Sequence, residues 1–141
     1  WCCLVGSEMC IRDRAWFADA NSRSDISSKS AVRIIDAMLR YPELVAGEGR
    51  ACTELMRAAQ GKVALKTGAE GFFVAIIPEK KMGVALKVLD GATRASECVI
   101  ASILVGLGVL NPANPIVEKY LQPSILNWDG LKTGFIKPLI M

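Results

Sequence analysis

The sequence predicts an α+β fold in which helices cover an antiparallel sheet, and three features of the pattern indicate it. Apolar residues first recur at the spacing of an α-helix, from about residue 27 to residue 60. From Lys62 the pattern changes to short extended runs rich in Val, Ile and Phe. A long and mostly apolar helical segment then spans residues 93–108. A chain of 141 residues with no repeat or linker forms one domain or part of one.

The first expected helix begins at Ser27 or Ser28, because either hydroxyl can accept a hydrogen bond from the free N–H groups of a helix N-terminus. Pro42 ends this helix or lies just beyond its end. The apolar face of the helix is formed by Ala31, Ile34, Ile35, Met38 and Leu39.

A glycine-containing turn region at residues 45–50 follows the first helix. We expect a second, short helix to begin at Thr53 and to end with Gly61 as its C-terminal cap. The extended part of the pattern then starts at once, so this helix is expected to lie beside the sheet.

Three strands are expected at residues 62–66, 72–77 and 84–89. The second and third flank a turn at residues 78–83 that contains Pro and Gly, so they should form an antiparallel hairpin.

The segment at residues 93–108 is expected to be a helix capped by Asp90 or Thr93. It is apolar on most sides and should therefore be buried. A short helix at residues 116–121 and a last strand at residues 131–136 follow, and this strand could complete the sheet.

Composition excludes two classes of function. Lysines and arginines are scattered, the net charge is only +3 and aromatic residues make up 6%, so a nucleic-acid surface is not indicated. The longest apolar run, residues 98–110, is shorter than the span of about 20 residues that crosses a bilayer. We therefore expect no nucleic-acid or membrane partner, and a cytoplasmic location.

The cysteines and the absence of histidine limit the chemistry further. The chain has five cysteines without a metal-like CxxC pair, and no histidine. A local zinc site or a histidine-based catalytic dyad therefore cannot be built from this chain alone, and we expect no metal-binding residue in it.

The first fourteen residues differ in character from the rest. The run Met9-Cys10-Ile11-Arg12-Asp13-Arg14 resembles the conceptual translation of a transposon-end sequencing adapter, although a native loop could carry the same letters. We therefore treat residues 1–14 as non-native and residues 15–141 as part of a domain whose upstream portion is missing. Cys52 and Cys98 then remain as expected buried free thiols.

The most pointed local feature is Lys66-Thr67-Gly68, followed by Ala-Glu-Gly, between the first two expected strands. A lysine at a strand end can place an ammonium in a cleft, where it can stabilise an oxyanion or hold a carboxylate. Glycine lets a substrate approach the backbone closely. The alternative is a solvated strand lysine beside a glycine-rich turn.

Three further residues and a second copy of the motif also need interpretation. Arg50 could bind a substrate carboxylate through two hydrogen bonds, or could pair with Glu48 or Glu54. Glu70 and Arg94 are interpreted as turn or ion-pair residues. A second Lys-Thr-Gly at residues 132–134 lacks the Ala-Glu-Gly continuation and is interpreted as structural.

Five segments together resemble the type II (Rhizobium-type) L-asparaginases in order and spacing, over roughly residues 30–138. They are Pro42-Glu43-Leu44-Val45-Ala46-Gly47-x-Gly49-Arg50, Leu55-Met56, Lys66-x-Gly68-Ala69-Glu70-Gly71, Asp90-Gly91-x-x-Arg94-Ala95 and Asn127-Trp128-x-Gly130-x-x-x-Gly134.

The resemblance implies a serine β-lactamase/glutaminase-like fold, of which this chain is the C-terminal part. It also implies hydrolysis of L-asparagine to L-aspartate and ammonia by a homodimer, with a Ser-x-x-Lys nucleophile and a zinc ion bound by cysteines and a lysine. Residues 15–141 contain no Ser-x-x-Lys in a suitable context, so the nucleophile and zinc ligands are expected upstream and this chain alone is expected to be inactive. Lys66 matches the family's catalytic lysine motif, and Thr67 and Gly68 would shape the pocket wall beside it.

Two alternatives stay open. One is a glutaminase or penicillin-recognising enzyme of the same fold, which Lys-Thr-Gly alone would also fit. The other is a non-catalytic binding or structural module that is complete in itself.

Overall fold

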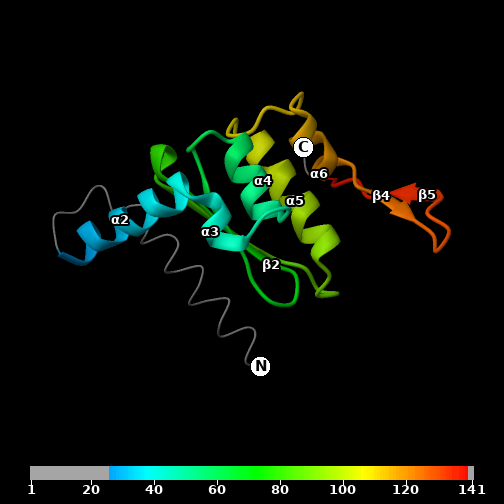
Figure 1. Ribbon diagram of the computed structural model, residues 1–141, viewed down its shortest axis with the longest axis horizontal. Helices are drawn as coiled ribbons and strands as arrows, with labels where there is room; N and C mark the ends of the chain where they lie inside the picture. The colour runs from blue at the N-terminus through cyan, green and yellow to red at the C-terminus, as the bar shows by residue number, and fades with distance from the viewer. Residues whose placement is uncertain (1–25, 140–141) are drawn as a thin grey trace.

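The computed structural model describes residues 26–139, and their mixture of helices and small antiparallel sheets confirms the α+β class (Figure 1). The segment at residues 1–14, predicted to be non-native, lies outside the described residues. The helices are α2 (Ile26–Arg40), α3 (Pro42–Ala46), α4 (Ala51–Ala58), α5 (Thr93–Gly106) and α6 (Pro115–Leu121). The strands are β1 (Ala64–Thr67), β2 (Phe72–Ile77), β3 (Met82–Lys87), β4 (Ser124–Leu126) and β5 (Lys132–Phe135).

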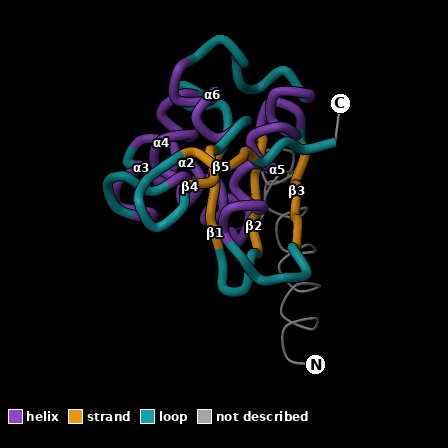
Figure 2. The backbone as a smooth tube through the Cα atoms, turned by 90° about the vertical axis from the view of Figure 1, so that its right-hand side faces the viewer, coloured by secondary structure: helices purple, strands orange, loops and turns teal. Residues whose placement is uncertain are grey.

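Strands β1, β2 and β3 form one antiparallel sheet in chain order, which Figure 2 shows side by side. The predicted hairpin of β2 and β3 is confirmed, with Phe72 opposite Lys87 and Ile77 opposite Met82. A short 3₁₀ turn, Pro78–Lys80, and a left-handed Lys81 connect the two strands.

The side chains of this sheet alternate between two apolar layers, as the period of a strand requires. One layer faces α4 and α5, which run next to each other over the sheet (Figure 1), and there Leu65 and Phe73 are fully buried. On the other layer Ala64 and Ile76 pack against Ile35 of α2. The sheet therefore lies between α2 and the α4–α5 pair.

The helices begin and end differently from the predictions at several places. Helix α2 is described from Ile26 onward, so Ser27 and Ser28 lie within the helix and are not its cap. The predicted turn at residues 45–50 is partly helical, because Pro42 starts α3 as its first residue, a position where proline loses no hydrogen bond.

Helix α4 begins two residues before the predicted start at Thr53. The hydroxyl of Thr53 is buried and donates to the carbonyl of Gly47 at 2.6 Å, so this residue joins α4 to the end of α3. Helix α5 has no side-chain cap: Asp90 accepts a hydrogen bond from the N–H of Ala92 before the helix, and Thr93 is its first residue.

The last strand does not complete the sheet as predicted. Strand β5 pairs with β4, a strand that the sequence did not indicate, in a separate two-stranded sheet. Figure 1 shows this hairpin extending from the body beyond α6. Side chains in β4 are exposed, so no buried apolar pattern marked it as a strand.

One other prediction, on the two cysteines of the described residues, is confirmed. Cys52 and Cys98 are buried free thiols. Within residues 26–139 no helix is long and apolar enough to cross a membrane.

Candidate functional site

Lys66 lies one residue before the end of β1 and opposite Val74 of β2. Its side chain is exposed, and its Nζ donates a hydrogen bond to the carbonyl oxygen of Thr67 at 2.7 Å. The ammonium group is thus held at the end of the strand. It is accessible to a ligand because it does not pair with a carboxylate among the described residues.

Thr67 is attached to helix α4 through its backbone. Its N–H donates to Sγ of Cys52 at 3.2 Å, and Cys52 is only 1% exposed. Burial raises the pKa of the Cys52 thiol, against smaller opposing effects of the Thr67 N–H, Lys66 and Arg50. The thiol therefore stays protonated, and its position fixes the strand end against the helix.

Gly68 directly follows β1 and lies close to the side chain of Phe72. Its N–H donates to the carbonyl of Phe72 at 2.8 Å, which closes the loop between β1 and β2. A Cβ at this position would lie 2.9 Å from Cδ1 of Phe72, closer than real Cβ atoms approach other atoms. The absence of a side chain here is therefore required by packing.

Glu70 has the turn and ion-pair role predicted for it. Its backbone has a left-handed φ of 56°. Lys87 donates to the Glu70 carbonyl at 2.6 Å and lies 3.3 Å from its carboxylate. Arg94 likewise forms an ion pair, with Asp90 at 3.2 Å, as its interpretation as an ion-pair residue predicted.

Arg50 directly precedes α4 and does not have the ion-pair partners considered for it. Glu48 pairs with Arg57 at 2.7 Å, and Glu54 pairs with Lys119 at 2.8 Å. Within residues 26–139, the side chain of Arg50 forms no hydrogen bond or ion pair, and only its carbonyl accepts one, from the N–H of Glu54. Its exposed guanidinium is therefore available to an anion.

The two parts of the predicted site meet at the start of α4. Arg50 precedes this helix, Cys52 lies in its first turn, and Thr67 bonds to that cysteine. Lys66 and Arg50 both stabilise the charged form of the Cys52 thiol, so both positive charges lie near it. The fold thus brings Arg50, Lys66, Thr67 and Gly68 to one edge of the sheet.

A polar network at the same edge was missed from the sequence. The Tyr120 hydroxyl donates to Glu54 at 2.5 Å. Hydrogen bonds from Lys119 and then Tyr120 lower the pKa of Glu54, whereas burial and the bond to Glu54 raise that of Tyr120. Glu54 is far from these partners in sequence, so no local pattern linked them.

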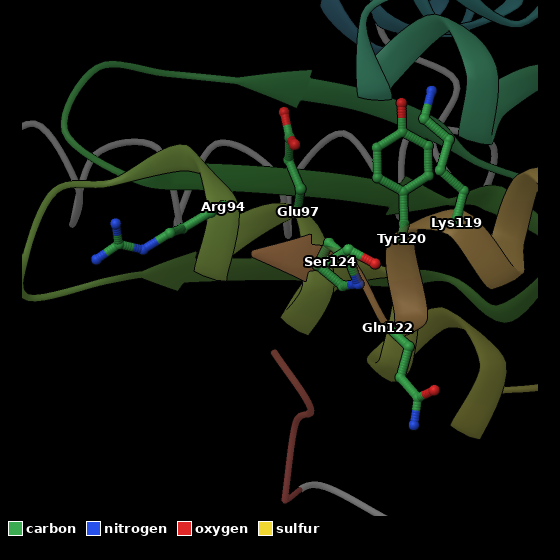
Figure 3. A pocket seen from close by; sticks show the side chains of 7 residues that line it. Arg94, Glu97, Lys119, Tyr120, Gln122 and Ser124 are labelled. Atoms are coloured by element: carbon green, nitrogen blue, oxygen red, sulfur yellow. The ribbon is translucent and has the colours of Figure 1, made fainter. Parts of the chain in front are cut away.

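A pocket of about 470 Å³ adjoins this network between α5, α6 and the start of β4 (Figure 3). In Figure 3 the head groups of Glu97, Tyr120 and Lys119 point to the same side, while that of Arg94 points away from them. The lining residues are Arg94, Glu97, Lys119, Tyr120, Gln122, Pro123 and Ser124.

The residues of this part of the chain do not fit the zinc ion that the resemblance implies. No group of three or more Cys, Asp, Glu or His side chains within residues 26–139 is placed to hold a metal. The two described thiols have other roles, since Cys52 accepts from Thr67 and Cys98 donates to the carbonyl of Leu121. No chemical step in this chain is therefore assigned to zinc.

The chain matches a known protein family. A family model described as L-asparaginase II matches residues 10–138. A search of curated proteins found no match. The matched range begins inside the segment at residues 1–14, so the boundary drawn after residue 14 stays a prediction.

Proposed function

This chain belongs to the L-asparaginase II family, and we propose that it forms one wall of an active site that hydrolyses L-asparagine to L-aspartate and ammonia. The observation that carries the proposal is the meeting of Lys66, Thr67 and Arg50 around Cys52 at the start of α4. Two cations that have no carboxylate partner among the described residues suit a substrate that carries a carboxylate and develops negative charge on its amide oxygen during the reaction.

Lys66 has an electrostatic role in this proposal. When an amide carbon is attacked, negative charge develops on its oxygen, and a fixed ammonium stabilises that charge more than it stabilises the substrate. The same positive charge favours the deprotonated form of a neighbouring base. The Thr67 carbonyl holds the ammonium in place before the substrate arrives.

Arg50 and the strand end shape the rest of the wall. The guanidinium of Arg50 can bind the substrate carboxylate through two parallel hydrogen bonds. Thr67 and the side-chain-free Gly68 then line the approach to the reacting amide. The nucleophile of the reaction is proposed to be a Ser-x-x-Lys serine from a part of the parent protein outside these residues.

A pair of lysine variants in the intact parent protein tests this function. Lys66→Ala should reduce kcat for L-asparagine by about 10²–10³, the usual loss when one preorganised electrostatic group is removed. Lys132→Ala, in the second Lys-Thr-Gly, is the matched control and should leave kcat within about threefold of the original. Ammonia release is the measurement.

The thermal unfolding temperature of both variants is measured alongside activity. Lys66 is exposed, so its replacement should leave the unfolding temperature unchanged and a loss of rate can be assigned to the reaction. A loss below about threefold for Lys66→Ala would contradict the proposed role. A preference for L-glutamine would instead indicate a glutaminase.

A further inference from the structure

Glu97 is a carboxylate that the proposed reaction does not yet use. It lies on α5, is half-buried, and lines the pocket between α5 and α6. Within residues 26–139 the carboxylate of Glu97 forms no hydrogen bond or ion pair. A partly desolvated charge without a partner lowers the stability of a protein, unless a bound ligand pairs with it.

Burial and two nearby cations act on the pKa of the Glu97 carboxylate. Burial raises its pKa, whereas Arg50 and then Lys119 attract its charged form. Lys119 is already bonded to Glu54, but Arg50 has no partner of its own among the described residues. Arg50 and Glu97 therefore attract each other without forming an ion pair.

The connection between the pocket and Arg50 also has a structural basis. Arg50 is the N-cap of α4, and its carbonyl oxygen accepts a hydrogen bond from the N–H of Glu54 at 3.0 Å. Glu54 in turn accepts the Tyr120 hydroxyl, and Tyr120 lines the pocket next to Glu97 (Figure 3). Arg50 is thus bonded to a polar network whose Tyr120 lines the same pocket as Glu97, although Arg50 itself does not line that pocket.

We propose that Glu97 binds the α-ammonium group of a free α-amino acid whose carboxylate is bound by Arg50. The inference rests on the proposed function, and it makes Glu97 a specificity-determining residue for substrates with an unblocked α-amino group. The pocket volume of about 470 Å³ lies within the usual range for small-ligand sites, about 300–1,000 Å³.

The chemistry of the two groups fits a zwitterion better than a simple anion. A dicarboxylate without an amino group would leave Glu97 unpaired and would repel it. An α-amino acid neutralises Arg50 and Glu97 together, and each contact is a charge-assisted hydrogen bond. Sites built to bind a polar group discriminate strongly against analogues that lack it.

Two amides that differ only in the α-amino group test the inference in the intact parent protein. They are L-asparagine and succinamate, which has hydrogen in place of the amino group. The original protein should favour L-asparagine in kcat/KM. Glu97→Gln should lower kcat/KM for L-asparagine by about 10- to 100-fold, mainly through KM, and change that for succinamate by less than about threefold.

Glu118→Gln is the matched control, because Glu118 is exposed on α6 and does not line the pocket. It should change neither substrate. An equal loss for both substrates in Glu97→Gln would reduce Glu97 to a structural residue and overturn the inference. No effect on L-asparagine would overturn it as well.

A binding measurement separates this inference from the proposed function. If the protein hydrolyses neither amide, the proposed hydrolysis fails, and calorimetric titration with L-aspartate and succinate decides the role of Glu97. Tighter binding of L-aspartate that is lost in Glu97→Gln supports the ammonium site. Equal binding of the two acids, or binding of neither, overturns it.

Discussion

The tripeptide Lys-Thr-Gly occurs at residues 66–68, where it ends β1, and again at residues 132–134 in β5. The first copy is part of a three-stranded sheet with α4 packed behind it. The second copy is part of a two-stranded hairpin in which nearly every side chain is exposed. The two copies have the same three residues, but they differ in their sheet, in the exposure of that sheet and in the helix packed behind them.

The difference is clearest at the two threonines. The N–H of Thr67 bonds to a buried sulfur of a helix fifteen positions earlier in the chain. Thr133 instead donates its hydroxyl to the carbonyl of Ile125 in the neighbouring strand, at 3.2 Å. The two copies of the motif thus differ in the elements that hold them in place.

The phenylalanines beside the two motifs provide the largest expected contrast. Phe73 pairs with Thr67 and is completely buried, whereas Phe135 follows Gly134 and is 55% exposed. Phe73→Ala should lower the free energy of unfolding by about 3–5 kcal/mol, because it removes buried surface and leaves a cavity. Phe135→Ala should cost less than about 1 kcal/mol. Urea unfolding followed by circular dichroism measures both, and similar costs would show that the second hairpin is as tightly packed as the first.

A smaller effect is expected at Glu54, which ties α4, and with it the first motif, to α6. Glu54→Gln should cost about 1–2 kcal/mol at neutral pH, because the carboxylate loses its charge-assisted bonds to Lys119 and Tyr120. The folded-state pKa of Glu54 is lowered, so this stability is present above its ordinary pKa of 4.5 and is lost as the pH falls through the lowered value.

The measurement for Glu54 is urea unfolding of the original and variant proteins over a series of pH values. The difference in unfolding free energy should shrink once the pH drops below 4.5. Glu118→Gln, on the exposed side of α6, should show no such difference at any pH. A constant difference across the series would mean that the Glu54 charge does not contribute.

The smallest contrast is expected at the two glycines. Gly68→Ala should cost about 1–2 kcal/mol, since its Cβ would meet Cδ1 of Phe72 at 2.9 Å. Gly134→Ala should change stability by no more than about 0.5 kcal/mol, because the nearest atom is Cδ1 of Ile125 at 3.8 Å, an ordinary contact. Thermal unfolding of the two variants measures this pair, and equal shifts would show that Phe72 moves aside without cost.

Much of the local structure followed from the sequence. The predicted bounds of the strand at residues 72–77 agree with β2, because alternation is a local property, whereas its hairpin partner, predicted at residues 84–89, begins and ends two residues earlier as β3. The start of α4 was placed too late, since Thr53 suggested a cap. Its hydroxyl instead bonds to Gly47, which lies outside the helix and could not be foreseen from propensity.

The candidate site followed from the sequence only in part. Lys66, Thr67, Gly68 and Arg50 were identified from motifs, and their roles stay predictions. Glu97, which we propose as a ligand-binding residue, was not identified from the sequence, because an acidic residue in a helix has no distinctive pattern. Its isolation became apparent only when Glu54 was found bonded to Lys119 and Tyr120.

By itself, the sequence determined the α+β class, the family and the order of most elements, because periodicity and motif spacing act over a few residues at a time. Only the tertiary structure decided which copy of Lys-Thr-Gly has a helix behind it, and that β5 pairs with β4. It also decided which charged side chains within residues 26–139 have no ion-pair partner. These outcomes depend on contacts such as Tyr120 with Glu54, sixty-six positions apart, and the free energy of such a contact is not encoded in either segment alone.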